Sequence, residues 1–313
     1  MKKILLILTG GTICTSVIDG KRTLNTHNAV TMLVEKFNKS GSEYTDFVSF
    51  EIQRPVNILS ENMNISVWNN LISYFKNIKY ENFDGIIIAH GTDTLAYTSA
   101  LFSLLLNGIN IPVIFVSSNA PLGNIKSNGN DNFKYAVEGI CDGSIKQGVW
   151  VAYKNISNGK MSVHKGACIK QAQDYSDDFY SFDFNYSLPD MLIKKIDKLK
   201  DSVLYINPYV GMDYNLYNLK KVRAVLHGTY HSGTVESNSF QLFAKKCEEE
   251  GIPVFVSPCK NMYSEIYSSV SDVLKHGVID VYGTTSEFLY CKILVAFSLF
   301  DDIKMAVGFV KDN

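Results

Sequence analysis

The sequence predicts an α/β protein with a larger N-terminal domain, whose mainly parallel sheet is flanked by helices, and a smaller C-terminal α/β domain. Short apolar runs alternate with stretches of helical periodicity along most of the 313 residues. The runs are nearly continuous in their apolar residues, which is typical of parallel strands covered on both faces. Apolar residues make up 46% of the chain and charged residues 19%, so a core can form without disulfide or metal crosslinks.

The elements follow in order along the chain. The expected strands are Lys3–Leu8, Gly85–His90, Val113–Ser117, Gly148–Tyr153, Val203–Asn207, Ala224–His227, Pro253–Ser257 and Val278–Tyr282. The expected helices are Ala29–Asn38, Val67–Phe75, Thr94–Leu106, Asn132–Cys141, Phe240–Glu250, Glu265–His276 and Ser286–Phe300. The stretch from Asp174 to Lys200 is acidic and aromatic, then basic, and lacks this rhythm. We therefore expect an N-terminal domain over 1–185, a linker over 186–201 and a C-terminal domain over 202–313.

Charge and cysteine content restrict the partners and the compartment. With 30 basic and 31 acidic residues, nothing favours binding to nucleic acid or to an anionic membrane. The six cysteines contain no C-x-x-C pair, so we expect reduced thiols in a cytoplasmic protein rather than disulfides or a zinc site. The apolar run after Lys3 is too short for a secretory signal and is expected to be a buried strand. No apolar stretch reaches the roughly 20 residues of a transmembrane helix.

Two threonine-rich turns follow strands, where open α/β sheets bind ligands. TGGTI stands at 9–13 and HGTDT at 90–94, the latter leading directly into a helix. Free backbone N–H groups at such a helix start suit a carboxylate or a developing oxyanion. Each turn alone is also explained by simple capping, through Thr12 in the first and Thr92, Asp93 or Thr94 in the second. Capping explains less well why two strand ends carry such turns.

The pair of motifs, TGGTI and HGTDTLAYTSA, resembles the two signatures of the bacterial L-asparaginase/glutaminase family. The likeness continues in the segments 60–63, 127–132 and 148–165, and becomes looser beyond Lys165. The resemblance implies an asparaginase of the cytoplasmic type, hydrolysing L-asparagine and possibly L-glutamine without a metal or cofactor. It also implies a homodimer or homotetramer.

Membership would give individual residues a role. The resemblance implies that Thr12 is the nucleophile and Thr92 the second active-site threonine. It implies that Asp93 binds the substrate's α-amino group, Ser60 its α-carboxylate, and that Lys165 lies near Thr92 and Asp93. A lysine beside a carboxylate and a hydroxyl can take or share the proton of the weakly nucleophilic threonine. Further substrate contacts are expected from Glu61, Gly11, Gly91 and Ser118.

The sequence also departs from the family pattern. The loop 14–27 contains no tyrosine, although many relatives carry one there. Asn128 stands where the family usually has aspartate, and the segment 117–121 lacks the usual glycine. These changes favour an altered amide substrate, such as glutamine, a D-isomer or an asparagine within a larger molecule. In the C-terminal part, the resemblance suggests interface contacts, and simple loop capping is an equal alternative. The candidate contact residues are Tyr230, His231, Ser232 and Glu287.

Two other functions stay open. One is a catalytically weak protein that binds or senses an amino acid, supported by the missing loop tyrosine. The other is an amidotransferase component that acts on charged tRNA, because one such component contains an asparaginase-like domain. That component has an additional N-terminal domain, whereas the first strand here starts at Lys3 and the chain is near neutral, so we rank it third.

Overall fold

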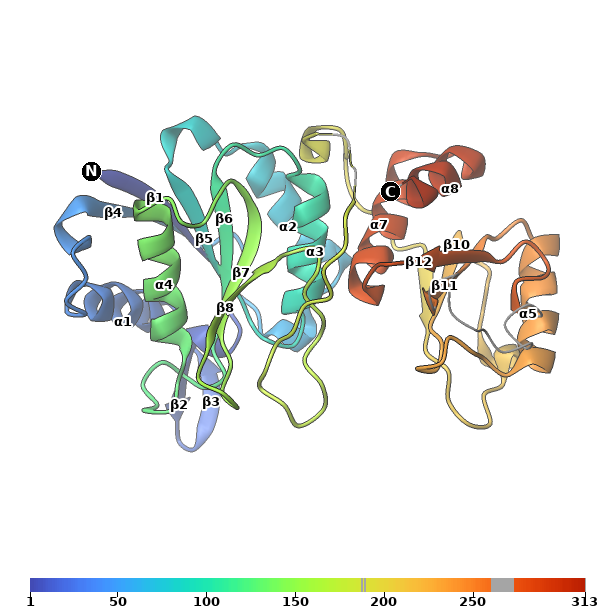
Figure 1. The fold of residues 1–313 in the computed structure, drawn as a ribbon, viewed down its shortest axis with the longest axis horizontal. Helices are drawn as coiled ribbons and strands as arrows, with labels where there is room; N and C mark the ends of the chain where they lie inside the picture. Colours follow the sequence, from blue (N-terminus) through green and yellow to red (C-terminus); the bar gives the residue numbers. More distant parts are fainter. Residues whose placement is uncertain (187, 189, 260–272, 313) are drawn as a thin grey trace. The chain divides into compact units, whose positions relative to one another are not determined.

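The computed structural model describes residues 1–186, 188, 190–259 and 273–312, which form two compact units (Figure 1). Unit 1 comprises Met1–Ser181 and Leu188–Lys195, and unit 2 comprises Phe182–Ser187 and Ile196–Asn313. The sequence-derived bounds of domains and linker remain a proposal. Most of the expected helix Glu265–His276 lies outside the described residues.

Unit 1 contains a six-stranded sheet in the order β4-β1-β5-β6-β7-β8. Its strands are β1 (Lys2–Leu8), β4 (Val48–Gln53), β5 (Gly85–Ala89), β6 (Pro112–Val116), β7 (Gly148–Lys154) and β8 (Met161–Lys165). All neighbours run parallel except β7 and β8, which confirms the mainly parallel sheet. The sequence analysis missed the two edge strands, β4 and β8, because both mix polar and apolar residues and most of their residues are only partly buried.

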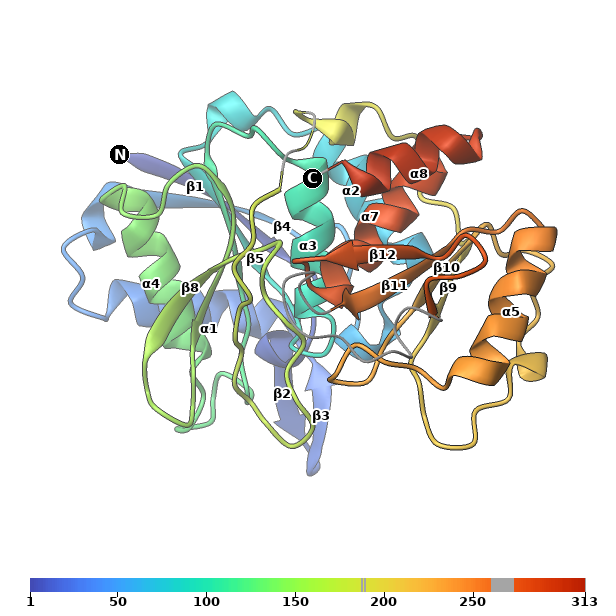
Figure 2. The same ribbon diagram turned by 45° about the vertical axis from the view of Figure 1, so that its right-hand side comes forward.

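Four helices cover the two faces of this sheet (Figures 1 and 2). They are α1 (Thr26–Asn38), α2 (Ile65–Lys76), α3 (Leu95–Leu105) and α4 (Gly129–Cys141). Residues of α1 and α4 share one core with the apolar side chains of β1, β5 and β6. On the opposite face, Phe75 of α2 and Phe102 of α3 pack ring to ring, and Phe102 contacts Phe115 of β6. Side-chain caps start two helices, with Asn25 preceding α1 and Asn64 preceding α2.

A short hairpin follows the first strand, where the sequence analysis expected only a loop. Its strands are β2 (Thr15–Ile18) and β3 (Lys21–Leu24), paired antiparallel. Asp19 and Gly20 at the tip both adopt positive φ angles of 50° and 73°. That backbone geometry is the one that closes two-residue hairpins, so the turn itself fixes the hairpin.

Unit 2 contains a four-stranded parallel sheet in the order β12-β11-β10-β9. Its strands are β9 (Val203–Ile206), β10 (Ala224–His227), β11 (Val254–Cys259) and β12 (Ile279–Tyr282). Helix α5 (Ser237–Glu249) covers one face, and α7 (Ser286–Leu299) and α8 (Ile303–Lys311) cover the other (Figure 2). Within the described ranges, no helix has the length and apolarity needed to cross a membrane.

Each unit places a buried histidine at the end of a central strand. His90 follows β5, and its Nδ1 lies 2.8 Å from the carbonyl oxygen of Gly91. His227 ends β10, and its Nδ1 lies 2.6 Å from the carbonyl oxygen of Gly228. Neither side chain has exposed surface. Burial lowers the pKa of both imidazoles to about 4, against a smaller opposing effect of these hydrogen bonds.

Because His90 and His227 are buried and have low pKa values, we expect the protein to lose stability in mild acid. A histidine has a pKa of about 6.5 when unfolded, so the unfolded chain takes up these protons first as the pH falls. Their contribution is therefore complete above about pH 6.5 and declines as the pH falls towards 4. The cost should reach about 2 kcal/mol per histidine at pH 5.

Urea unfolding of the wild type and of His227→Asn at pH 7 and pH 5 measures this effect. The variant should lose less stability between the two pH values than the wild type does. A matched substitution of the exposed His27 to Asn should leave the pH dependence as it is. Equal pH dependence in all three proteins would contradict the assignment.

Candidate active site

Three turns of unit 1 meet backbone to backbone at the carboxyl ends of β1 and β5. Gly11 adopts a φ of +70°, and a Cβ atom on it would lie 2.1 Å from the Cα of Gly91. A Cβ on Gly91 would lie 2.4 Å from both Cβ and Oγ of Ser60. The N–H of Gly11 also donates to the carbonyl of Ile58, at 2.8 Å. Only glycine fits at both contact positions, so the two glycine motifs are needed for the turns to meet.

This contact brings two of the predicted site residues, Thr12 and Thr92, to the same edge of the sheet. Each follows directly after one of the touching glycines, and each side chain is half-buried. Neither hydroxyl makes a hydrogen bond within the described part of the chain. Cys14 is a rival nucleophile by position, but burial raises the pKa of its thiol to about 12, so it stays protonated. A nucleophilic role for either threonine hydroxyl stays a proposal.

Ser60 and Asp93 form a direct pair. The Ser60 hydroxyl is buried and donates to Oδ2 of the exposed Asp93, at 2.8 Å. Thr94 donates its hydroxyl to the Ser60 carbonyl, at 3.1 Å. Thr94 thus occupies the N-cap position of α3 without capping it through its side chain. The capping alternative therefore does not explain this threonine, which instead ties two turns of the site together.

Lys165 ends β8 and is exposed, and the segment after it is fixed to α3. The carbonyl of Gly166 accepts a hydrogen bond from Ser99 of α3, at 3.1 Å. A Cβ on Gly166 would lie 2.6 Å from Oγ of Ser103, so the backbone packs directly on that helix. Gln171 then donates its side-chain amide to the carbonyl of Asp93, at 2.6 Å. These bonds hold the end of β8 beside the helix that begins after the HGTD turn.

Ser118 is fully buried and already hydrogen-bonded. Its hydroxyl lies 2.8 Å from that of Ser127 and donates to the carbonyl of Ala120. In the same loop, Asn119 and Asn128 exchange backbone and side-chain hydrogen bonds at 3.0 and 3.1 Å. The hydroxyl of Ser118 is thus engaged within the protein, which leaves its role in substrate binding a proposal.

Asn128 also explains one departure from the family pattern. Its side-chain N–H donates to the carbonyl of Lys154 at 2.7 Å, while its side-chain oxygen accepts from the backbone of Asn119. An aspartate could make only the second of these bonds, because a carboxylate has no N–H to donate. The amide therefore fits this loop better than the acid.

The remaining predicted residues lie at the rim or in unit 2. Glu61 is exposed and begins the 3₁₀ turn η3 (Ser60–Asn62) with its neighbour Ser60. In unit 2, Tyr230 and His231 are exposed, and Ser232 bonds through its hydroxyl to that of Thr234. Glu287 is buried in the first turn of α7. An interface role for these unit 2 residues stays a proposal.

The sequence analysis missed two hydrogen bonds that hold the site together. One joins Gln171 to Asp93, and the other joins Thr94 to the Ser60 turn. Gln171 lies in an irregular segment and belongs to no recognisable motif, so only its contact with Asp93 reveals it. Thr94 was assigned to capping because its position at a helix start is the usual one for that role. Its contact with a turn 34 residues earlier could not be read from local sequence.

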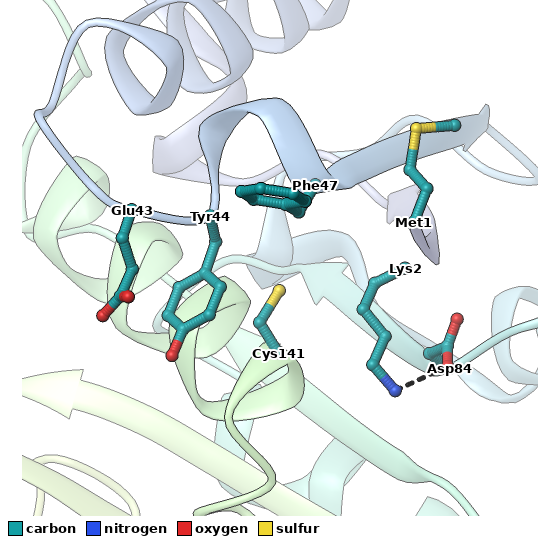
Figure 3. Close-up of a pocket in the computed structure, with 7 residues that line it drawn as sticks. All are labelled: Met1, Lys2, Glu43, Tyr44, Phe47, Asp84 and Cys141. Carbon is teal, nitrogen blue, oxygen red and sulfur yellow. Dashed lines mark hydrogen bonds and ion pairs between the residues drawn. The ribbon is translucent and has the colours of Figure 1, made fainter.

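A hollow of about 420 Å³ lies at the opposite edge of the sheet, near the amino ends of β1 and β5 (Figure 3). Lys2 and Asp84 line it and pair with each other at 2.9 Å. Cys141 also lines it, and burial raises the pKa of this thiol. Lys2 and Asp84 therefore neutralise each other, and the thiol stays protonated. Nowhere in the described residues do three or more His, Cys, Asp or Glu side chains gather as a metal site would require.

A model of the N-terminal part of asparaginases matches residues 3–188, which include all the site residues of unit 1. The chain belongs to the asparaginase family. A glutamyl-tRNA(Gln) amidotransferase subunit from Methanobrevibacter smithii is 27% identical, over 100% of this chain and 76% of its own length. The corresponding protein from Thermococcus kodakarensis is 25% identical, over 97% and 73%.

Solved asparaginase structures share the fold. The thermostable L-asparaginase from Thermococcus kodakarensis superposes with a TM-score of 0.79 at 20% identity, covering 99% of this chain and 97% of its own. L-asparaginase I from Vibrio cholerae gives 0.77 at 19% identity, covering 100% and 97%. These matches confirm the predicted α/β fold class. At such identities they show the fold and leave the specific activity open.

The close contact between Gly91 and Ser60 can be tested by substitution. Gly91→Ala should cost about 1–3 kcal/mol of unfolding free energy, because the new methyl group would overlap Ser60. Gly123→Ala is the matched control, since its nearest neighbour would be 3.8 Å away. Urea unfolding of both variants measures the difference. If Gly91→Ala is as stable as Gly123→Ala, the close packing of the turns is wrong.

The loop around Asn128 makes a second prediction. Asn128→Asp should destabilise the protein by about 1–3 kcal/mol, because the carbonyl of Lys154 loses its donor. Asn158→Asp is the comparison and should keep wild-type stability, because Asn158 is exposed and its side-chain oxygen accepts from the backbone N–H of Lys160, as an aspartate could. Thermal unfolding at pH 7 measures both. An Asn128→Asp variant with wild-type stability would show that the amide is not required.

Proposed function

We propose that this asparaginase-family protein hydrolyses the side-chain amide of a small amino acid and releases ammonia, with L-asparagine as the first candidate substrate. The convergence of the Gly11, Gly91 and Ser60 turns carries the proposal. Thr12 and Thr92 directly follow the two touching glycines, and Ser60 and Asp93 form a hydroxyl–carboxylate pair in the same group of turns. Such a group of residues can both bind an amino acid and attack its amide.

The proposed reaction starts with Thr12. Its hydroxyl oxygen attacks the amide carbon of the substrate, and its proton passes through Thr92 and Lys165, which activate this weak nucleophile. Backbone N–H groups of the glycine turns stabilise the negative oxygen of the tetrahedral intermediate. The same proton is then delivered to the amide nitrogen, so that collapse of the intermediate breaks the C–N bond and releases ammonia. Water then hydrolyses the resulting ester, giving the amino-acid carboxylate and free Thr12.

The Ser60–Asp93 pair is the proposed anchor for the amino-acid end. The Asp93 carboxylate accepts hydrogen bonds from the substrate's ammonium group, and this charged contact is stronger than the bond it now receives from Ser60. The Ser60 hydroxyl is then released to donate to the substrate's carboxylate. Glu61, at the exposed rim beside Ser60, adds negative charge near the ammonium. Gly11, Gly91 and the Ser118 loop complete the proposed binding surface.

Two features support a substrate other than asparagine as the alternative. The loop 14–27 forms a hairpin without a tyrosine, so the proton path differs from that of many relatives. The relatives at 25–27% identity over nearly the whole chain are named as amidotransferase subunits rather than asparaginases. Glutamine or another amide is therefore the second substrate class. A homodimer or homotetramer in the cytoplasm remains the proposed assembly and location.

The decisive variant is Thr12→Ala. Ammonia release from L-asparagine, L-glutamine and D-asparagine should be measured for the wild type and for this variant. The wild type should act on at least one of the three, and the variant should lose about three or more orders of magnitude in kcat. Thr31→Ala, an exposed threonine of α1, is the matched control and should keep wild-type activity.

Two outcomes would refute parts of this proposal. If Thr12→Ala retains activity, the nucleophile is a different group. If the wild type releases no ammonia from any of the three amides, the proposal that the protein is a simple amidohydrolase is wrong. The same assay with glutamine and glutamyl-tRNA(Gln) then tests the role named for the relatives, and stimulation by the tRNA would support a function in amide transfer.

A further inference from the structure

We infer that His90 is a positioning residue for the candidate site, because its Nδ1–H holds the carbonyl of the one glycine on which two other site turns rest. This inference rests on the proposed function. Gly91 touches Gly11, the residue before the proposed nucleophile, and also touches Ser60. It directly precedes Thr92. A rotation of the His90–Gly91–Thr92 backbone would therefore disturb three site turns together.

The direction of the hydrogen bond follows from its acceptor. The Gly91 carbonyl can only accept, so the hydrogen lies on Nδ1 of His90, which is 2.8 Å away. The backbone is held from the other side as well, because the N–H of His90 donates to the carbonyl of Val116 at 2.9 Å. The ring packs edge-on against Phe115, with centroids 5.9 Å apart. Both ring and backbone are thus fixed, and they orient the carbonyl of Gly91.

The second ring nitrogen argues against a purely stabilising role. Nε2 of His90 is fully buried and has no hydrogen-bond partner among the described residues. An unsatisfied buried polar atom lowers stability, so this imidazole is not optimised for holding the fold. It also stays neutral in the working pH range, because burial lowers its pKa to about 4. A neutral ring whose only donor is engaged with Gly91 orients the turn and does not transfer a proton.

His227 makes the same type of hydrogen bond in unit 2, outside the candidate site. Its Nδ1 makes the equivalent bond to the carbonyl of Gly228, but its Nε2 is also bonded, to the hydroxyl of Tyr214 at 2.9 Å. Both of its nitrogens are thus satisfied, as expected for a residue that stabilises a core. The chain therefore supplies its own control for a buried histidine at a strand end followed by Gly-Thr.

Two substitutions at His90 distinguish the roles of its two ring nitrogens. Asn places its amide nitrogen where Nδ1 lies and can still donate to Gly91, whereas Gln extends to the position of Nε2 and loses that bond. We expect His90→Asn to retain kcat within about threefold and His90→Gln to lose at least about tenfold, with a smaller change in KM. The control His227→Gln should lower the melting temperature and leave kcat near that of the wild type.

The outcomes distinguish positioning from general stability. Equal losses of kcat in His90→Asn and His90→Gln would overturn the inference, as would a His227→Gln variant that loses as much kcat as His90→Gln. A loss in His90→Gln that is fully explained by unfolding, measured by thermal melting at the assay temperature, would overturn it as well.

A spectroscopic readout is independent of catalysis. In protein labelled with ¹⁵N-histidine, the two ring nitrogens of His90 should show the Nδ1–H tautomer at pH 7, which is the minor form of free histidine. The resonances are assigned by their absence in His90→Asn. If the hydrogen is found on Nε2, the inference fails even when the enzyme is active. If the wild type releases no ammonia but the tautomer is as expected, the proposed function fails and the His90–Gly91 bond stands.

Discussion

The candidate site depends on the backbone contact between Gly11 and Gly91 at the carboxyl ends of two neighbouring strands. Parallel pairing of β1 with β5 brings the two strand ends together, and the absence of side chains lets the turns touch. The strand pairing and the glycine contact together bring Thr12 and Thr92 to the same edge. The Ser60 turn rests on Gly91 and is tied to it through Asp93 and Thr94. Rigid strands therefore position residues that stand in irregular turns.

Continuous apolar runs predicted the inner strands of the sheets to within one or two residues. The reason is that a parallel strand covered on both faces consists almost entirely of apolar residues. The edge strands β4 and β8 and the hairpin β2–β3 were missed, since these edge strands are partly polar and the hairpin depends on two positive φ angles. The two glycine motifs pointed to the right edge of the sheet. Gln171 and the unsatisfied nitrogen of His90 could not be predicted, because their importance lies in contacts with residues distant in sequence.

The family and the residues at the site define a reaction class more firmly than a substrate. The proposed hydroxyl nucleophile, carboxylate anchor and backbone donors suit any small amino acid with a side-chain amide. Specificity depends on the shape of the surrounding loops, and here the loop 14–27 and the Asn119–Asn128 loop depart from the family pattern. Solved structures that share the fold are named as asparaginases, whereas relatives found by sequence are named as amidotransferase subunits.

The central claim is that Thr12 is the group acylated during turnover, and peptide mapping tests it most directly. Wild-type protein would be mixed with L-asparagine or L-glutamine, quenched in acid within the first turnovers, digested and analysed by mass spectrometry. The account predicts an aminoacyl ester on the peptide that contains Thr12, located at that residue by fragmentation and absent from Thr12→Ala. An acyl group on another residue, or steady ammonia release without any acylated peptide, would contradict it.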